Sequence, residues 1–183
     1  MTNDIRSEDP APYYIPDKLH RYKLKKIISG GQTGVDRGAL DAALKCQFPT
    51  GGCCPKGRKA EDGKIPDCYP LDELPSGDYR KRTRQNVIDS DGTLIIYFGR
   101  LSGSTELTLI YCSREKKPYL LIDAEDLELD KASRKTLSFL KSENIKTLNV
   151  AGPRGSNHHL AYSYTKALIT LILNKIRLSG EKS

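Results

Sequence analysis

The feature that most constrains the fold is a pattern that occurs three times: an apolar stretch, a glycine-containing turn and then a helical pattern. The apolar stretches are KLKKIIS at 23–29, TLIIYFG at 93–99 and KTLNVAG at 146–152. Strands this apolar are typical of a sheet that is covered on both faces. Because strands and helices alternate, the pattern predicts an α/β fold with an open, mostly parallel sheet and helices on both faces.

Three further segments add detail to this prediction. PYLLIDA at 118–124 predicts a fourth strand, and DKASRKTLSFLKSEN at 130–144 predicts another helix. The segment from Thr50 to Asp91 is rich in Gly, Pro and charged residues, which predicts irregular structure until a helix begins near Asp78. Its scattered Cys, Ile, Tyr and Leu residues indicate that it packs onto the domain.

The length of 183 residues fits one domain with a proper hydrophobic core. We expect a single domain at 23–178, preceded by an N-terminal extension at 1–22 and followed by a tail at 179–183. No apolar run approaches the roughly 20 residues needed to span a bilayer. The first residues also lack the apolar core of a secretory signal, so we expect no membrane partner and a cytoplasmic location.

The charge balance favours anionic partners. Lys and Arg number 30 against 23 Asp and Glu, which gives a net charge of +7. Nucleic acid ranks low among such partners, because the chain has three Phe, no Trp and no nucleic-acid-binding motif. Five cysteines, an odd number without a CxxC spacing, predict neither a disulfide framework nor a zinc site. We therefore expect no metal site formed by protein ligands.

The glycine turns are the candidate binding elements. In a parallel sheet they fall at the carboxyl ends of the strands, where ligands bind in folds of this kind. The first turn is Gly30, Gly31, Gln32, Thr33 and Gly34, and related turns occur at Gly103–Thr105 and Gly152–Ser156. Free N–H groups at a helix start favour an anion, so the turns predict a phosphate or oxyanion site. The alternative is that the glycines only make the turns tight.

Basic residues strengthen the prediction of an anion site. Arg58, with Lys56 nearby, and Arg154 lie among glycines, and their guanidinium groups match an oxyanion in a bidentate way. Arg82 and Asn86 are four residues apart and share one face of the helix predicted near Asp78. For the other cations of this helix, a solvated face is the simpler interpretation; these are Arg80, Lys81 and Arg84.

Other reactive residues carry weaker signals. His158 and His159 are neighbours without a carboxylate partner, which does not indicate a metal site. Cys53 and Cys54 are more simply read as buried cysteines. Glu106 is the one plausible general base, although a first-turn glutamate is equally explained by the helix dipole. Because no nucleophile with an activating base is evident, the sequence favours a binding protein over an enzyme.

At this point several motifs together resemble a known family. SGGQTGVDRGALDAAL, GGCCPKGRKAEDGKIPDCYPL, YRKRTRQNVIDSDGTLII, GSTELT and LNVAGPRGS are similar, in this order, to the putative molybdenum carrier proteins, over residues 26–173. The resemblance implies a Rossmann-like fold and binding of the molybdenum cofactor, a molybdopterin phosphate carrying molybdenum, without turnover. It also implies a homo-oligomer, a tetramer, and points to molybdoenzymes or cofactor-synthesis proteins as partners.

The resemblance also implies a set of cofactor-binding residues. These are Gly30, Gly31, Gln32, Thr33 and Gly34 in the first turn, Lys56 and Arg58, then Gly103, Ser104 and Thr105, and finally Pro153, Arg154 and Ser156. The leading hypothesis is a carrier that binds, protects and transfers the cofactor or a related phosphorylated small molecule. The alternatives are a phosphoribohydrolase-like enzyme that uses Glu106 and an arginine, and a sensor of nucleotide-derived ligands. The turn RLSGSTE lacks the Pro-Gly-Gly-x-Gly-Thr sequence that such hydrolases favour.

Overall fold

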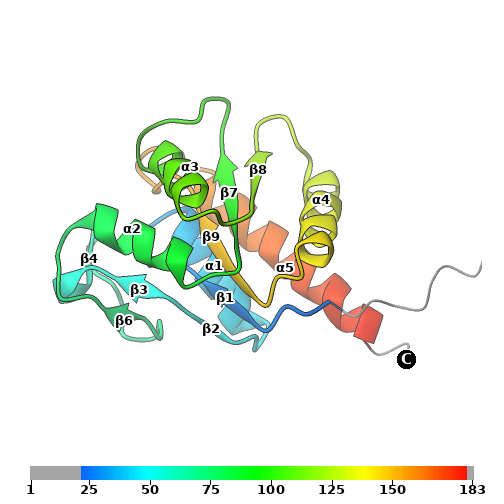
Figure 1. Ribbon diagram of the computed structural model, residues 1–183, viewed down its shortest axis with the longest axis horizontal. Helices are drawn as coiled ribbons and strands as arrows, with labels where there is room; N and C mark the ends of the chain where they lie inside the picture. The colour runs from blue at the N-terminus through cyan, green and yellow to red at the C-terminus, as the bar shows by residue number, and fades with distance from the viewer. Residues whose placement is uncertain (1–21, 181–183) are drawn as a thin grey trace, which may run out of the picture.

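The computed structural model describes residues 22–180, and its centre is a five-stranded parallel sheet (Figure 1). The strand order is β2-β1-β9-β7-β8, and each neighbouring pair is parallel. The strands are β1 (Lys26–Ile28), β2 (Thr50–Gly51), β7 (Gly92–Tyr97), β8 (Tyr119–Asp123) and β9 (Thr147–Ala151). The predicted parallel α/β sheet is therefore confirmed. The edge strand β2 was not predicted, because a Thr-Gly pair carries no apolar pattern.

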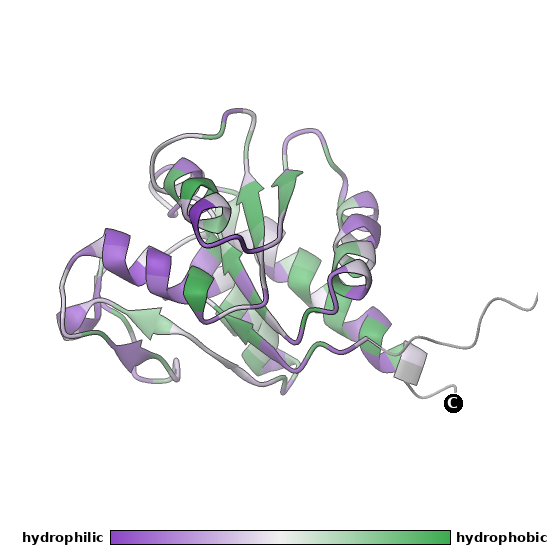
Figure 2. Cartoon of the chain, in the orientation of Figure 1, coloured by the Kyte–Doolittle hydropathy of each residue, from purple (hydrophilic) through white to green (hydrophobic). Residues whose placement is uncertain are grey.

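Helices cover both faces of the sheet, as predicted (Figure 1). One face carries α1 (Val35–Lys45), α4 (Leu129–Ser142) and α5 (Ala161–Gly180), and the other carries α2 (Tyr79–Ile88) and α3 (Gly103–Arg114). Figure 2 shows hydrophobic strands at the centre, whereas α2 is hydrophilic along most of its length.

The side chains of β7 show how both faces are used. Successive residues of a strand point to opposite faces. Leu94 and Ile96 belong to the large core formed with α1, α4 and α5. Ile95 instead packs with Val87 and Cys112 of α2 and α3. The uninterrupted apolar run of this strand is therefore the direct consequence of burial on both sides.

The irregular segment after β2 packs onto the domain, as expected. It contains two short strand pairs, β3 (Cys53–Cys54) with β6 (Asp72–Glu73) and β4 (Lys59–Ala60) with β5 (Gly63–Lys64), and a 3-10 turn, η1 (Lys56–Arg58). A separate buried cluster anchors it against α1; this cluster consists of Leu40, Cys54, Ile65, Tyr69 and Leu71.

The predicted terminal segments lie mostly outside the described residues. Of the expected N-terminal extension at 1–22, only Tyr22 is described, and of the tail at 179–183 only residues 179 and 180, which belong to α5. In the part of the chain that the structure describes, no helix has the length and apolar character needed to cross a membrane.

The cysteines give a test of this packing. Cys68 is exposed, whereas Cys53, Cys54 and Cys112 are buried. Burial raises the pKa of all three buried thiols, that of Cys53 to about 11 with the help of the nearby Asp89 carboxylate. Because the thiolate is the reactive form, we expect iodoacetamide at about pH 8 to modify Cys68 quickly and the three buried thiols only after denaturation. Peptide mass mapping measures this, and rapid native labelling of Cys53 would contradict the packing.

Candidate anion-binding site

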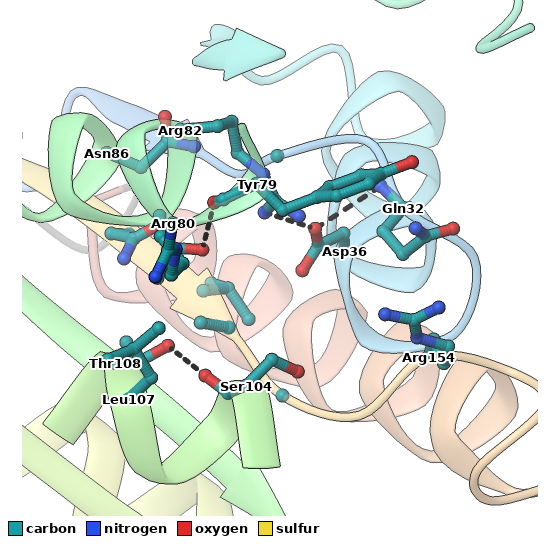
Figure 3. A pocket seen from close by; sticks show the side chains of 16 residues that line it. Gln32, Asp36, Tyr79, Arg80, Arg82, Asn86, Ser104, Leu107, Thr108 and Arg154 are labelled. Atoms are coloured by element: carbon teal, nitrogen blue, oxygen red, sulfur yellow. Dashed lines mark hydrogen bonds and ion pairs between the residues drawn. The ribbon is translucent and has the colours of Figure 1, made fainter. Parts of the chain in front are cut away.

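A pocket opens at the carboxyl edge of the sheet, between the first glycine turn, α2, α3 and the turn after β9 (Figure 3). Its volume is about 70 Å³. Pockets that enclose a drug-sized ligand are typically about 300 Å³ or larger, so the enclosed space of this pocket matches a group the size of an oxyanion and not a whole cofactor. Its polar lining residues are Gln32, Asp36, Tyr79, Arg80, Arg82, Thr83, Asn86, Ser104, Thr108, Asn149 and Arg154.

A buried ion pair closes the base of this pocket. Arg82 of α2 donates from Nη1 to the Asp36 carboxylate of α1 at 3.0 Å, and their side chains are 12% and 5% exposed. Burial raises the pKa of Asp36, while Arg82 and the backbone N–H of Gln32, at 3.2 Å, act in the opposite direction. The pair therefore fixes the Arg82 guanidinium beside the first glycine turn.

Gly30 makes this position of Arg82 possible. A Cβ atom at residue 30 would lie 1.8 Å from Arg82 Nη1 and 2.3 Å from its Cζ. Any side chain at residue 30 would therefore displace the guanidinium. The missing side chain at Gly30 therefore leaves space for the Arg82 guanidinium.

Two buried donors of the pocket residues have no hydrogen-bond partner among the described residues: Gln32 Nε2 and Arg82 Nε. The orientation of the Gln32 amide is fixed, because Oε1 accepts from the N–H groups of Thr33 at 3.0 Å and Glu61 at 2.9 Å. Nε2 must then be the free end. Since unpaired buried donors are costly, their presence in one pocket points to a ligand that supplies acceptors.

The first and third glycine turns lie against each other. A Cβ atom on Gly34, whose φ is 76°, would lie 2.5 Å from the Pro153 carbonyl oxygen. Val35 N–H donates to that oxygen at 3.1 Å, and Gly155 N–H donates to Thr33 Oγ1 at 3.0 Å. Close approach of the two turns therefore explains why residue 34 is a glycine. At this position the simpler alternative holds, in which a glycine only makes the turn tight.

The structure brings part of the predicted set into the pocket. Four predicted residues line it: Gly30, Gln32, Ser104 and Arg154. Thr33, Gly34, Pro153 and Ser156 form the turn-to-turn junction beside the pocket. Gly31 instead faces Ile65 and Leu71 of the irregular segment. Gly103 begins α3 with a φ of 59°, and Thr105 lines a separate hollow with Phe98 and His158. Ligand contact by these residues stays a prediction.

Arg58 lies outside the pocket, and its guanidinium has another role. It donates to the carbonyl oxygens of Ile65, Pro66, Tyr69 and Leu71 at 2.9–3.2 Å. These bonds hold the irregular segment in its path, so we do not retain Arg58 in the candidate site. Lys56 is exposed and is also not among the pocket residues.

The sequence did not reveal the partner of Arg82 or the position of Arg80. Asp36 and Arg82 are 46 residues apart, a separation that no local pattern reports. Arg80, predicted on a solvated face, is 73% exposed and pairs with Asp78 at 3.1 Å, yet it also lines the pocket. A usable signal was present in α2, which carries four basic residues and no acidic one.

Two other candidates from the sequence add no free donor to the pocket: Asn86 lines it with its side chain already paired, and Glu106 lies outside its lining. Asn86 is buried and exchanges two hydrogen bonds with the backbone of Cys53, at 2.8 and 3.1 Å, which indicates a structural role. Glu106 is exposed and does not line the pocket. Residues 22–180 contain no group of three or more His, Cys, Asp or Glu side chains that could hold a metal ion.

Comparison with known proteins agrees with this arrangement of strands and turns. A family model described as "Circularly permutated YpsA SLOG family" matches residues 27–173. The chain belongs to this family. A crystal structure named "Putative molybdenum carrier protein" from Syntrophus aciditrophicus SB is similar, with 46% sequence identity and a TM-score of 0.82. The match covers 84% of this chain and 97% of that one. No curated protein sequence matches the chain.

Substitution of Gly30 tests the placement of Arg82. We expect Gly30→Ala to displace the guanidinium and lower the free energy of unfolding by about 1–3 kcal/mol, the usual cost of overpacking. Gly77→Ala is the control, since a Cβ atom there meets no atom within 4 Å. Urea unfolding of both variants measures the difference. Equal stability of Gly30→Ala and the native chain would show that Arg82 does not occupy this position.

The pH dependence of stability tests the hydrogen bonds that Glu61 accepts from Thr33 and Ser156. Burial alone would raise the pKa of Glu61, but hydrogen bonds from Ser156 and Thr33 outweigh it and lower the pKa below the ordinary 4.5. The ionised form therefore stabilises the folded state above pH 4.5, and the effect disappears as pH falls through the lowered pKa. We expect Glu61→Gln to lower the melting temperature more at about pH 7 than at about pH 3. An equal loss at both pH values would contradict the lowered pKa.

Proposed function

We propose that this chain is a carrier that binds the molybdenum cofactor as cargo, shields it and passes it on without chemical turnover. The observation that carries the proposal is the pair of unpartnered buried donors, on Gln32 and Arg82, in a pocket at the carboxyl edge of the sheet. The name of the similar crystal structure supports the choice of a molybdenum-containing ligand.

The donor set suits an oxyanion. Gln32 and Arg82 line the pocket and each carries a buried N–H group without a protein acceptor, while Arg80 and Arg154 bring further positive charge to its walls. The molybdenum cofactor offers such acceptors at both ends, a phosphate and the molybdate oxygens. Hydrogen bonds between charged groups are shorter and stronger than neutral ones, so a few of them anchor one end of the ligand.

The volume of the pocket supports anchoring by one end. About 70 Å³ holds one oxyanion and not a pterin. The heterocycle would then lie in the mouth, near Tyr79 of α2 and Leu107 of α3, which are also pocket residues. A phosphorylated small molecule related to the cofactor would be held in the same way.

The hydrolase alternative has little support in the site. Its general base, Glu106, is exposed and lies outside the lining of the pocket. Incubation with AMP followed by chromatography decides between the two hypotheses. Release of adenine that is abolished in Glu106→Gln would overturn the carrier proposal.

A single isosteric substitution tests the pocket. In Gln32→Glu one carboxylate oxygen still accepts from Thr33 and Glu61, while the free amide donor becomes an acceptor. We expect the affinity for the molybdenum cofactor to fall by more than about tenfold, because a hydrogen bond to a charged group contributes about 1.5–3 kcal/mol and repulsion adds to its loss.

The measurement is the amount of pterin and molybdenum that co-purifies from cells that synthesise the cofactor. Gln47→Glu, an exposed residue just after α1, is the control for the added charge. Retention of cofactor in the control and its loss in Gln32→Glu is the expected result. Equal loading of both variants would exclude this pocket as the binding site.

A further inference from the structure

The tip of the β4–β5 hairpin inserts an acidic side chain between the first and third glycine turns. Glu61 and Asp62 form the turn that joins the two strands. The Glu61 carboxylate accepts hydrogen bonds from Thr33 Oγ1, from Ser156 Oγ and, at 3.1 Å, from the Ser156 N–H. Arg154 Nε lies 3.8 Å from the same carboxylate. The Glu61 carboxylate thus accepts hydrogen bonds from both turns.

The groups that surround the Glu61 carboxylate are of the kinds that bind oxyanions. Two hydroxyl groups, one backbone N–H and one guanidinium converge on a group with two negatively charged oxygens. Backbone amides in turns and arginine side chains are the donors that bind phosphate groups in proteins. Glu61 therefore stands where an external oxyanion would be held.

This junction is continuous with the pocket. Arg154 belongs to both, and Gln32 lines the pocket while its Oε1 accepts from the Glu61 N–H at 2.9 Å. Figure 3 shows Arg154 and Gln32 on the same side of the pocket. The pocket and the junction therefore share residues, as the binding of one ligand with two anionic ends requires.

The acidic tip of the hairpin is held by polar contacts near the surface, while Ala60 at its base packs against the buried cluster. Asp62 pairs with Arg37 of α1 at 2.5 and 2.7 Å, next to the Glu61 contacts. The two strands have only two residues each, and Lys59, Gly63 and Lys64 are exposed. Displacement of the tip would break ion pairs and hydrogen bonds near the surface but would not open the hydrophobic core.

We propose that the junction of the first and third glycine turns is a second oxyanion subsite, which Glu61 fills in the free protein and yields to one anionic end of the bound ligand. The proposal rests on the proposed function, and its ligand class is a small molecule with two oxyanion ends. A dianion interacts more strongly with Arg154 than a single carboxylate does, so Glu61 favours dianionic ligands over monocarboxylates. The side chain is thus a determinant of specificity within the binding site.

Sulfate binding to Glu61→Gln tests the proposal with a defined probe. The glutamine keeps an oxygen acceptor for Ser156 and Thr33 but removes the competing charge. We expect sulfate to bind the junction of this variant at least about tenfold more tightly than that of the native chain, and to shift the amide signals of Ser156 and Gly155 in ¹⁵N–¹H spectra. Glu73→Gln, an exposed glutamate of β6 in the same segment, controls for the change in net charge.

The outcomes separate the two proposals. If Ser156 titrates only in Glu61→Gln, the second subsite is established, whether or not the signals of Gln32 and Arg82 respond. If Ser156 responds equally in the native chain and both variants, or in none, Glu61 is a structural link and the subsite proposal is wrong. Absence of a sulfate response at Gln32 and Arg82 in every protein would instead count against the pocket of the proposed function. Glu61→Ala repeats the test should the glutamine hold the tip in place.

Discussion

The buried ion pair between Asp36 and Arg82 is the interaction on which the site depends. It joins the helix that follows the first glycine turn to the helix that begins at Tyr79, on opposite faces of the sheet. A buried ion pair adds little net stability, because desolvation offsets its attraction, but removing one partner costs about 3–5 kcal/mol. The value of the pair lies in position: it holds a guanidinium at the carboxyl edge of the sheet with one N–H left free.

The glycines of the first turn follow from this arrangement. Gly30 leaves room for Arg82, and Gly34 leaves room for the chain at 153–155. Both turns are therefore packed before any ligand binds, and the donors that remain free are side-chain groups, with Gln32 Nε2 foremost. Preorganised donors bind an oxyanion without a further loss of conformational entropy. The glycine turns thus serve the anion site indirectly, by placing the side chains that form it.

The sequence predicted the elements whose signals are local. The run TLIIYFG became β7, because burial on both faces demands unbroken apolar residues. Asp78 was placed at the start of a helix and is its N-cap, accepting from Arg80 N–H. The short strands β2 to β6 could not be predicted, because two-residue strands carry no periodicity.

The candidate site was less predictable, because its contacts connect distant segments. Arg58 was assigned to the ligand on account of its glycine neighbours, but its carbonyl partners lie 7–13 residues further along the chain. The pairing of Arg82 with Asp36 and the bridge that Glu61 makes between the two turns could not be predicted from the sequence either, because both join distant residues. Gln32 was identified through its position in the turn, yet its free amide nitrogen emerges only from the contacts made by its oxygen.

The most direct measurement is the position of molybdenum in a crystal of the protein loaded with the cofactor or soaked with molybdate. Anomalous scattering at the molybdenum absorption edge locates the metal without assumptions about the ligand. We expect one strong peak within hydrogen-bonding reach, through its oxygens, of Gln32 Nε2 and the Arg82 guanidinium, or at the Thr33–Ser156 junction with Glu61 displaced. A peak confined to another surface of the molecule, with Gln32 and Arg82 unchanged, would contradict it.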